Sequence, residues 1–379
     1  MIECVRVPLK LPNDREPSKP MIRDLVGTFL KEWATINPED LIVRYETDTS
    51  AHCFVERPKH LSPQGGSDPT KVFIKFHMEE GVGVEAFKDL VPSKKEEAAL
   101  VRHFSATGYG PKMIGFFDTD DGVQGRVDEL INSRTLEPED VETDDIRADI
   151  ANAYAALHAL KIPELRQNSV NMYYQAVLGG LRKYHKMEKL KRLGKEGGVD
   201  IDDVVDYDFA SKIERILDYM RSIGAKEGWC MHDVQYGNVL VRNKPDKGES
   251  KIALIDFEFA FRNYRGFDIG GHWFQKMFKW TGETNKIVDC RPYSEGEKRH
   301  FCDIYARKWN EITGDNDTAE QVFTEATLGY MLALSFDIHF MSMAMDDDDS
   351  KDPLDSLGLK KLLDEFEKGY LKFVSERVG

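Results

Sequence analysis

The chain has 379 residues, 41% of them hydrophobic and 31% charged, with a formal net charge of −15. This length allows a sizeable core divided between two lobes or domains, and the acidic balance argues against nucleic-acid binding, which requires a basic surface. The five cysteines form no Cys-x-x-Cys pair and no apolar leader opens the chain, so we expect reduced thiols and a cytoplasmic protein.

The N-terminal third is predicted to form a small lobe built on strands. Residues 1–20 are polar, so we expect a loose arm there, and residues 21–33 have the apolar spacing of an amphipathic helix. Strand patterns recur within the lobe, which we place at residues 21–130, over residues 41–45, 53–56, 72–76, 113–117 and 124–130.

Lys75 lies inside the apolar strand predicted over residues 72–76. A buried lysine is costly unless it is paired. It therefore either has a functional partner or points to solvent from an edge strand, and the residues by themselves leave both interpretations open. Residues 46–52, between the first two strands, are on the same grounds a plain hairpin turn.

Residues 131–379 are predicted to form a large, mainly helical lobe, because apolar residues recur at helical spacing over most of this range. The segments are residues 146–160, 170–193 and 209–220, and then most of 294–378 with a break near 346–353. The most apolar stretch, residues 329–345, contains Asp337 and is short for a membrane span, so we predict no transmembrane segment.

Residues 229–272 carry the strongest chemical pattern. Asp233 and Asn238 lie five positions apart in a short loop, and two predicted strands then lead to Asp256. A hairpin brings these three side chains together, which suits phosphoryl transfer from Mg-ATP. Asp233 would orient the acceptor hydroxyl and take its proton, while Asn238 and Asp256 would hold Mg²⁺. Turn capping explains one Asp-x4-Asn pair, but not all of these features together.

The run IDFEFAFRNYRGFDIGGHW at residues 255–273 resembles the signature of choline/ethanolamine kinases, a branch of the kinase-like fold shared with aminoglycoside phosphotransferases. The preceding loop resembles that family's His-Asn-Asp-x-x-x-Gly-Asn motif, with Met231 and His232 in place of the first two residues. The resemblance implies an α+β, bilobal, protein-kinase-like fold with an antiparallel sheet in the small lobe.

The resemblance also implies roles for residues that chemistry alone leaves open. Residues 46–52 become the phosphate-covering loop, although they lack the usual glycines, and residues 129–134 become the hinge beside the adenine. Asp268 is expected to bind the backbone of the catalytic loop. The residues expected at the nucleotide are Ser50, Lys75, Glu97, which would pair with Lys75, and Gln235.

The acceptor pocket is expected to be an aromatic cage, since aromatic faces attract quaternary ammonium ions. Residues 329–334 stand where the family's paired tryptophans are expected, and Gln275 replaces an expected Glu. Phe278 and Tyr330 could rebuild part of the cage. We assign three residues to the pocket: Phe259, Gln275 and Trp280.

The function that the resemblance implies is choline kinase, which forms phosphocholine from choline and ATP for phosphatidylcholine biosynthesis. One alternative is a kinase of ethanolamine or another small amino alcohol. The other is a catalytically weak nucleotide-binding pseudoenzyme, which the retention of Lys75, Glu97, Asp233, Asn238 and Asp256 opposes. The family is often dimeric, so a homodimer is the assembly that the resemblance implies.

Overall fold

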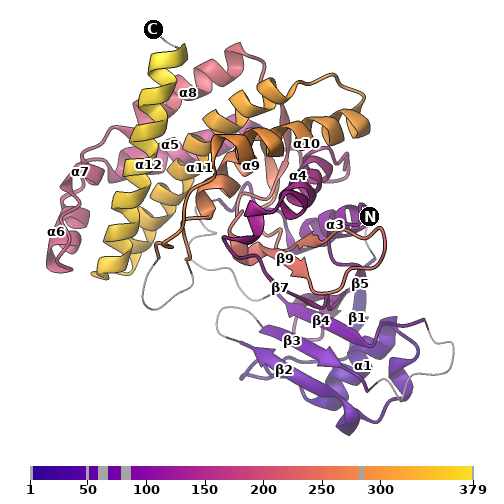
Figure 1. Cartoon of the computed structure of the whole chain (residues 1–379). Helices are drawn as coiled ribbons and strands as arrows, with labels where there is room; N and C mark the ends of the chain where they lie inside the picture. The colour runs from indigo at the N-terminus through magenta and orange to yellow at the C-terminus, as the bar shows by residue number, and fades with distance from the viewer. Residues whose placement is uncertain (1–2, 48–50, 59–66, 78–86, 281–285, 378–379) are drawn as a thin grey trace.

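The chain folds into two lobes in a computed structural model that describes residues 3–47, 51–58, 67–77, 87–280 and 286–377. The strands of the small lobe lie together in the lower part of Figure 1, and the helices of the large lobe lie above them. The predicted α+β organisation in two lobes is confirmed.

The small lobe is a six-stranded sheet in the order β1-β5-β6-β4-β3-β2, antiparallel except between β1 and β5. Side chains alternate between its faces: Cys53 and Ile74 pack into the apolar core with helix α1, and Lys75 faces the other way. The strands are β1 (Val5–Val7), β2 (Ile42–Glu46), β3 (Ala51–Glu56), β4 (Lys71–Phe76), β5 (Met113–Thr119) and β6 (Gln124–Glu129), and the helical segments between β1 and β2 are α1 (Lys19–Phe29), η1 (Trp33–Thr35) and η2 (Pro38–Asp40).

The N-terminal residues contradict the prediction of a loose arm. Strand β1 pairs in parallel with β5, with Val5 opposite Phe117, and both Val7 and Leu9 are buried. The prediction was wrong because the apolar residues here are few, and their partner strand lies more than a hundred residues further along the chain.

The large lobe is helical around two small sheets, in which β7 and β10 flank β9 and β8 pairs with β11. The predicted helix over residues 170–193 is in fact two helices, because Lys186 adopts a left-handed backbone conformation between them. The elements of this lobe are β7 (Ser133–Thr135), η4 (Asp140–Glu142), α4 (Asp144–His158), α5 (Val170–Tyr184), α6 (Glu188–Glu196), α7 (Asp202–Val205), α8 (Phe209–Ser222), β8 (Glu227–Cys230), η5 (Tyr236–Asn238), β9 (Val239–Arg242), β10 (Ile252–Leu254), β11 (Phe261–Tyr264), α9 (Gly266–Gln275), α10 (Glu295–Thr313), α11 (Ala319–Asp347) and α12 (Pro353–Arg377), while α3 (Lys94–Ser105) lies between β4 and β5 of the small lobe.

Helices α9 and α11 pack with their backbones in close contact. A Cβ atom added to Gly329 would lie 1.9 Å from the carbonyl oxygen of Gly266, and one added to Gly270 would lie 2.2 Å from the amide nitrogen of Tyr330. Only glycine allows this approach. Helix α11 is long and apolar enough to cross a membrane by length and composition, but 72% of its apolar window is buried inside the protein.

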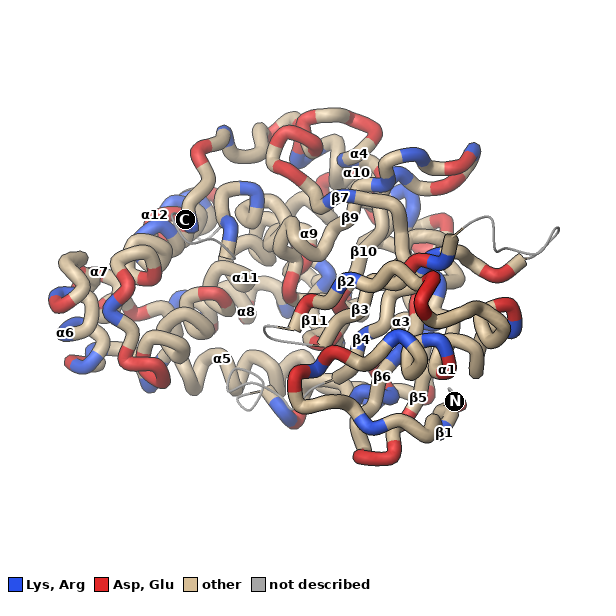
Figure 2. The backbone as a smooth tube through the Cα atoms, turned by 90° about the horizontal axis from the view of Figure 1, so that it is seen from below, with Lys and Arg blue, Asp and Glu red and all other residues tan. Residues whose placement is uncertain are grey.

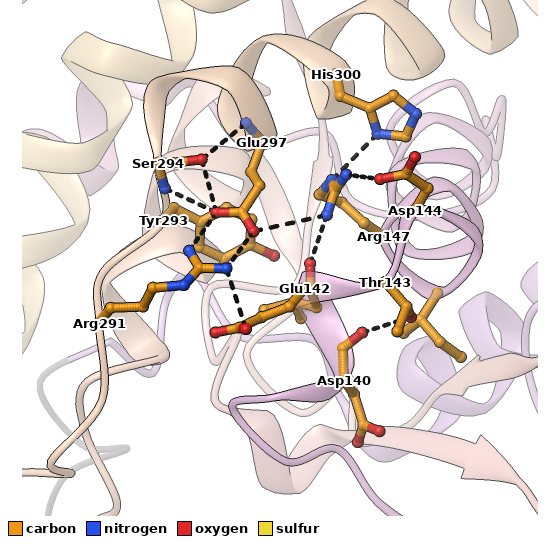
Figure 3. A network of polar contacts seen from close by, with 12 residues as sticks. Asp140, Glu142, Thr143, Asp144, Arg147, Arg291, Tyr293, Ser294, Glu297 and His300 are labelled. Carbon is orange, nitrogen blue, oxygen red and sulfur yellow. Dashed lines mark hydrogen bonds and ion pairs between the residues drawn. The ribbon is translucent and has the colours of Figure 1, made fainter.

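A network of polar contacts ties the start of α4 to the start of α10 (Figure 3). Glu142 accepts from Lys276 at 2.8 Å and pairs with Arg291 at 3.1 Å. Arg291 also binds Glu297, which forms a capping box with Ser294 at the start of α10. Glu142 therefore holds both ends of the segment between Lys276 and Arg291, which carries Trp280.

Charged residues of both signs are spread over both lobes (Figure 2). The net charge of −15 is therefore a property of the whole surface. The charge of any binding pocket has to be derived from the residues that line it.

Candidate active site

The loop that carries Asp233 and the hairpin that follows it have the predicted arrangement. Strands β9 and β10 pair antiparallel, with Val239 opposite Leu254. Just beyond the pair, the amide of Ile255 donates to the carbonyl oxygen of Asn238 at 3.0 Å. This bond places Asp256 beside Asn238, at the end of the hairpin that meets the small lobe.

Asp268 supports the loop from beneath. Its carboxylate is fully buried and accepts from the amides of Met231 at 2.7 Å and His232 at 3.1 Å. His158 contacts the same carboxylate at 3.1 Å. These are the contacts that the resemblance implies for Asp268.

His232 and Asp256 both have left-handed backbone conformations, with φ of 61° and 63°. Such conformations are uncommon outside glycine and persist where surrounding contacts hold them. The ring of His232 stacks on Phe261 at 3.7 Å and accepts a hydrogen bond from Asn263 at 2.9 Å. The strained loop is thus fixed on both sides, which keeps the neighbouring Asp233 in place.

Asp233 is partly buried, and its carboxylate accepts hydrogen bonds from two side-chain amides. Gln235 donates to its carboxylate at 3.0 Å and Asn238 at 2.9 Å. Burial raises the pKa of Asp233 to about 6 against the lowering effect of the Gln235 hydrogen bond, and the charge of Asp256 adds to the increase. A carboxylate with a pKa near 6 is ionised at neutral pH and is a better proton acceptor than an ordinary aspartate.

This pKa predicts an acidic limb in the activity profile. Below about pH 6 Asp233 takes up a proton and can no longer accept one from an acceptor hydroxyl. We therefore expect kcat/KM for the acceptor to fall about tenfold per pH unit below that point. Circular dichroism at each pH controls for unfolding, and a flat profile from pH 7 to 5 in folded protein would contradict the assignment of Asp233 as the base.

Lys75 faces the hairpin across the interlobe cleft. It is 5% exposed, and its ammonium lies 2.9 Å from Asp256 and 4.0 Å from Glu97. Burial disfavours its charge, but Asp256 and Glu97 outweigh this effect and raise the pKa of Lys75 above its usual value. It therefore stays cationic where phosphates would lie.

Glu97 is held more tightly by Arg126 than by its predicted partner Lys75. Arg126 donates to Glu97 at 2.6 Å and to Asp128 at 2.7 Å, and all three side chains are buried. Burial alone would raise the pKa of Glu97, but Lys75 and Arg126 lower it to about 2. The predicted Lys75–Glu97 pair is present, but its 4.0 Å separation is longer than the contact between Arg126 and Glu97.

Glu258 is a residue at this site that the sequence analysis missed. Its carboxylate lies 3.6 Å from the ammonium of Lys75. It lies two positions after Asp256, inside the run that resembles the family signature. That position was the feature of the sequence from which Glu258 could have been predicted as a site residue. Burial and the charge of Asp256 raise its pKa.

A cavity of about 780 Å³ lies between the small-lobe sheet and the hairpin and is the candidate nucleotide site. Lys75, Asp256 and the predicted hinge residues line it. Ser50, predicted at the nucleotide, lies outside the described residues. Gln235, predicted there too, lies instead in a second pocket beside Asp233.

The donor set at the hairpin fits Mg²⁺, which prefers carboxylate and amide oxygens. Asn238 is buried and donates its side-chain amide to Asp233, so its carbonyl oxygen remains for a metal. Asp256 binds Lys75 through one carboxylate oxygen, which leaves the other for a metal. These two residues would hold the ion.

The second pocket, of about 230 Å³, brings together the predicted acceptor residues Phe259, Gln275 and Trp280 with Asp233. Tyr330, predicted as a cage residue, donates to Glu365 instead. Helix α11 contributes a different face, which the sequence analysis missed: Phe336, Asp337, Phe340 and Met341.

The remaining cage candidate, Phe278, is not among the residues that line this pocket, and its ring stacks on Trp280 at a centroid distance of 5.0 Å. The missed residue with the clearest signal was Asp337, the acid within the apolar stretch over residues 329–345. In the aromatic wall, Phe336 and Phe340 take the places that the sequence analysis gave to Phe278 and Tyr330.

Comparison with known proteins identifies relatives of this chain. Residues 57–364 match the family model of choline/ethanolamine kinase. Choline kinase alpha of Mus musculus is 30% identical over 234 residues, 60% of this chain and 49% of the mouse protein. Choline/ethanolamine kinase of Homo sapiens is 24% identical over 279 residues, 72% of this chain and 65% of the human protein. The chain thus spans about half to two thirds of these relatives.

A solved structure supports the fold. The choline kinase of Cryptosporidium parvum Iowa II superposes with a TM-score of 0.64 over 95% of this chain and 97% of that one, at 13% sequence identity. This likeness confirms the predicted bilobal kinase-like architecture.

Proposed function

Because the chain belongs to the choline/ethanolamine kinase family, we propose that it transfers the γ-phosphoryl group of ATP to the hydroxyl of a small amino alcohol, with choline as the first candidate. The observation that carries this proposal is the position of Asp233. It lies beside Asp256, which faces the nucleotide cavity, and it lines the aromatic pocket.

The residues divide the chemistry between them. Asp233 holds the acceptor hydroxyl and takes its proton as the oxygen bonds to the γ-phosphorus and the bond to ADP breaks. Lys75 places positive charge on the phosphates. Asn238 and Asp256 would hold Mg²⁺, which would neutralise charge on the phosphate oxygens. Asp268 and His232 keep the loop in the conformation that aims Asp233 at the pocket.

The walls of the pocket support a cationic acceptor. Phe259 and Phe340 meet edge to face at 6.0 Å, and Phe336 lies 5.4 Å from Phe340. Aromatic faces attract ammonium ions with about 0.5–2 kcal/mol each, depending on desolvation.

With choline as the acceptor, the product would be phosphocholine, which would enter phosphatidylcholine biosynthesis.

A panel of acceptors tests the proposal. We expect purified protein with Mg-ATP to consume ATP in the presence of choline or ethanolamine, and not with a neutral alcohol such as ethylene glycol. Phosphorus NMR of the product identifies the phosphate ester. ATP binding without turnover on any amino alcohol would instead support the pseudoenzyme.

A further inference from the structure

Asp337 brings a second carboxylate into the acceptor pocket. It is only partly buried and lines the cavity together with Asp233. Gln275 donates to its Oδ2 atom at 2.9 Å, and no other hydrogen bond to Asp337 is found within the described part of the chain. Its Oδ1 atom is therefore available to a ligand.

Gln275 is fixed by contacts on both ends of its amide. Trp280 donates its indole N–H to the Gln275 carbonyl oxygen at 2.7 Å, while the Gln275 nitrogen donates to Asp337. This chain of bonds sets the orientation of the amide. It also links the aromatic wall of the pocket to the carboxylate, so Trp280 and Asp337 are presented to one ligand in a fixed arrangement.

The two acids of the pocket, Asp233 and Asp337, have no basic partner within the described residues. Among the described residues, neither Asp233 nor Asp337 forms an ion pair with a lysine, arginine or histidine. Burial and the nearby charge of Asp233 raise the pKa of Asp337 well above the usual value of an aspartate. A cation bound between the two carboxylates would relieve this repulsion and stabilise both ionised forms.

The chemistry of an ammonium ion decides which contact it uses. A quaternary ammonium has no N–H group, so it depends on aromatic faces and on charge at a distance. A primary ammonium has three N–H donors and forms short charge-assisted hydrogen bonds with a carboxylate. A carboxylate oxygen that is accessible in the pocket, as Oδ1 of Asp337 is, would therefore favour the primary ammonium.

We propose that Asp337 determines acceptor specificity in this protein, by accepting a hydrogen bond from the ammonium group of primary amino alcohols such as ethanolamine. The proposal rests on the proposed function, because it concerns the acceptor of the same reaction. The aromatic wall retains choline as an acceptor, and Asp337 adds preference for its unmethylated counterpart.

The primary test is Asp337→Asn, which keeps the shape of the side chain and an oxygen that can accept from Gln275. Binding of ethanolamine and of choline is measured by calorimetry, and KM for each is measured alongside. A hydrogen bond to a charged group is worth about tenfold or more in affinity. We expect ethanolamine affinity to fall about tenfold or more, choline affinity to fall less than about threefold, and KM for ATP to stay unchanged.

Two further variants make the test independent of folding defects. Asp337→Asn combined with Gln275→Glu returns one carboxylate to the pocket, and we expect it to recover most of the ethanolamine affinity. Trp280→Ala is the reciprocal variant, because it removes an aromatic face and should weaken choline more than ethanolamine. Melting temperatures are recorded for all variants.

The outcomes separate this inference from the proposed function. Equal loss of both ligands in Asp337→Asn, or no loss, overturns the role of Asp337 even if the enzyme phosphorylates both. Failure of the wild-type protein to bind either ligand overturns it as well. Selective loss of ethanolamine binding in a protein that turns over neither acceptor supports Asp337 as the recognition residue and rejects the kinase reaction.

Discussion

Asp233→Asn is expected to lower kcat by roughly 10²–10⁴-fold, the usual contribution of general base catalysis. The replacement leaves an oxygen to accept from Gln235 and Asn238, which bind this carboxylate at 3.0 and 2.9 Å. It removes the negative charge of the side chain and, with it, the ability to accept a proton at neutral pH. Steady-state kinetics with saturating Mg-ATP and acceptor measure the effect.

The matched control for this variant is Asp246→Asn. Asp246 is exposed in the turn between β9 and β10, on the same hairpin but away from both pockets, and its variant should keep wild-type turnover. An unchanged melting temperature in Asp233→Asn excludes unfolding as the cause. Near wild-type kcat in that variant would show that Asp233 is not the base.

Asp256→Ala and Asn238→Ala are expected to raise the Mg²⁺ concentration needed for half-maximal activity by at least about 10–100-fold. Removal of a group that merely supports a metal ligand already costs this much, and both residues are assigned as direct oxygen ligands. A titration of activity with Mg²⁺ in each variant gives the shift.

The two variants differ in their side effects, which gives an internal check. Asp256→Ala also removes the closest partner of Lys75, whereas Asn238→Ala removes a donor to Asp233. If both variants need more Mg²⁺ than wild type, the shared cause must be the loss of a metal ligand. The same Mg²⁺ dependence as wild type in both variants would reject the assigned ligands, and Asp246→Asn again provides the control.

The sequence by itself determined the geometry of the hairpin that brings the candidate site residues together. Asp233, Asn238 and Asp256 are close in the chain, and the strands between them form a local hairpin, so their meeting needs no long-range contact. The signature around Asp268 likewise predicted that this carboxylate binds the backbone of the loop, as it does at Met231 and His232. Local strand patterns also located most of the small lobe, because alternation of buried and exposed residues is readable without knowing the partner strand.

Tertiary structure decided the acceptor pocket and the edge of the sheet. Which face of α11 lines the pocket depends on the glycine contacts between α9 and α11, and these select Phe336 and Asp337 over Tyr330. Strand β1 exists because β5 offers it a free edge. Both outcomes depend on contacts between segments about 60 or more residues apart, and a hydrophobic pattern records that a residue is buried without recording what it is buried against.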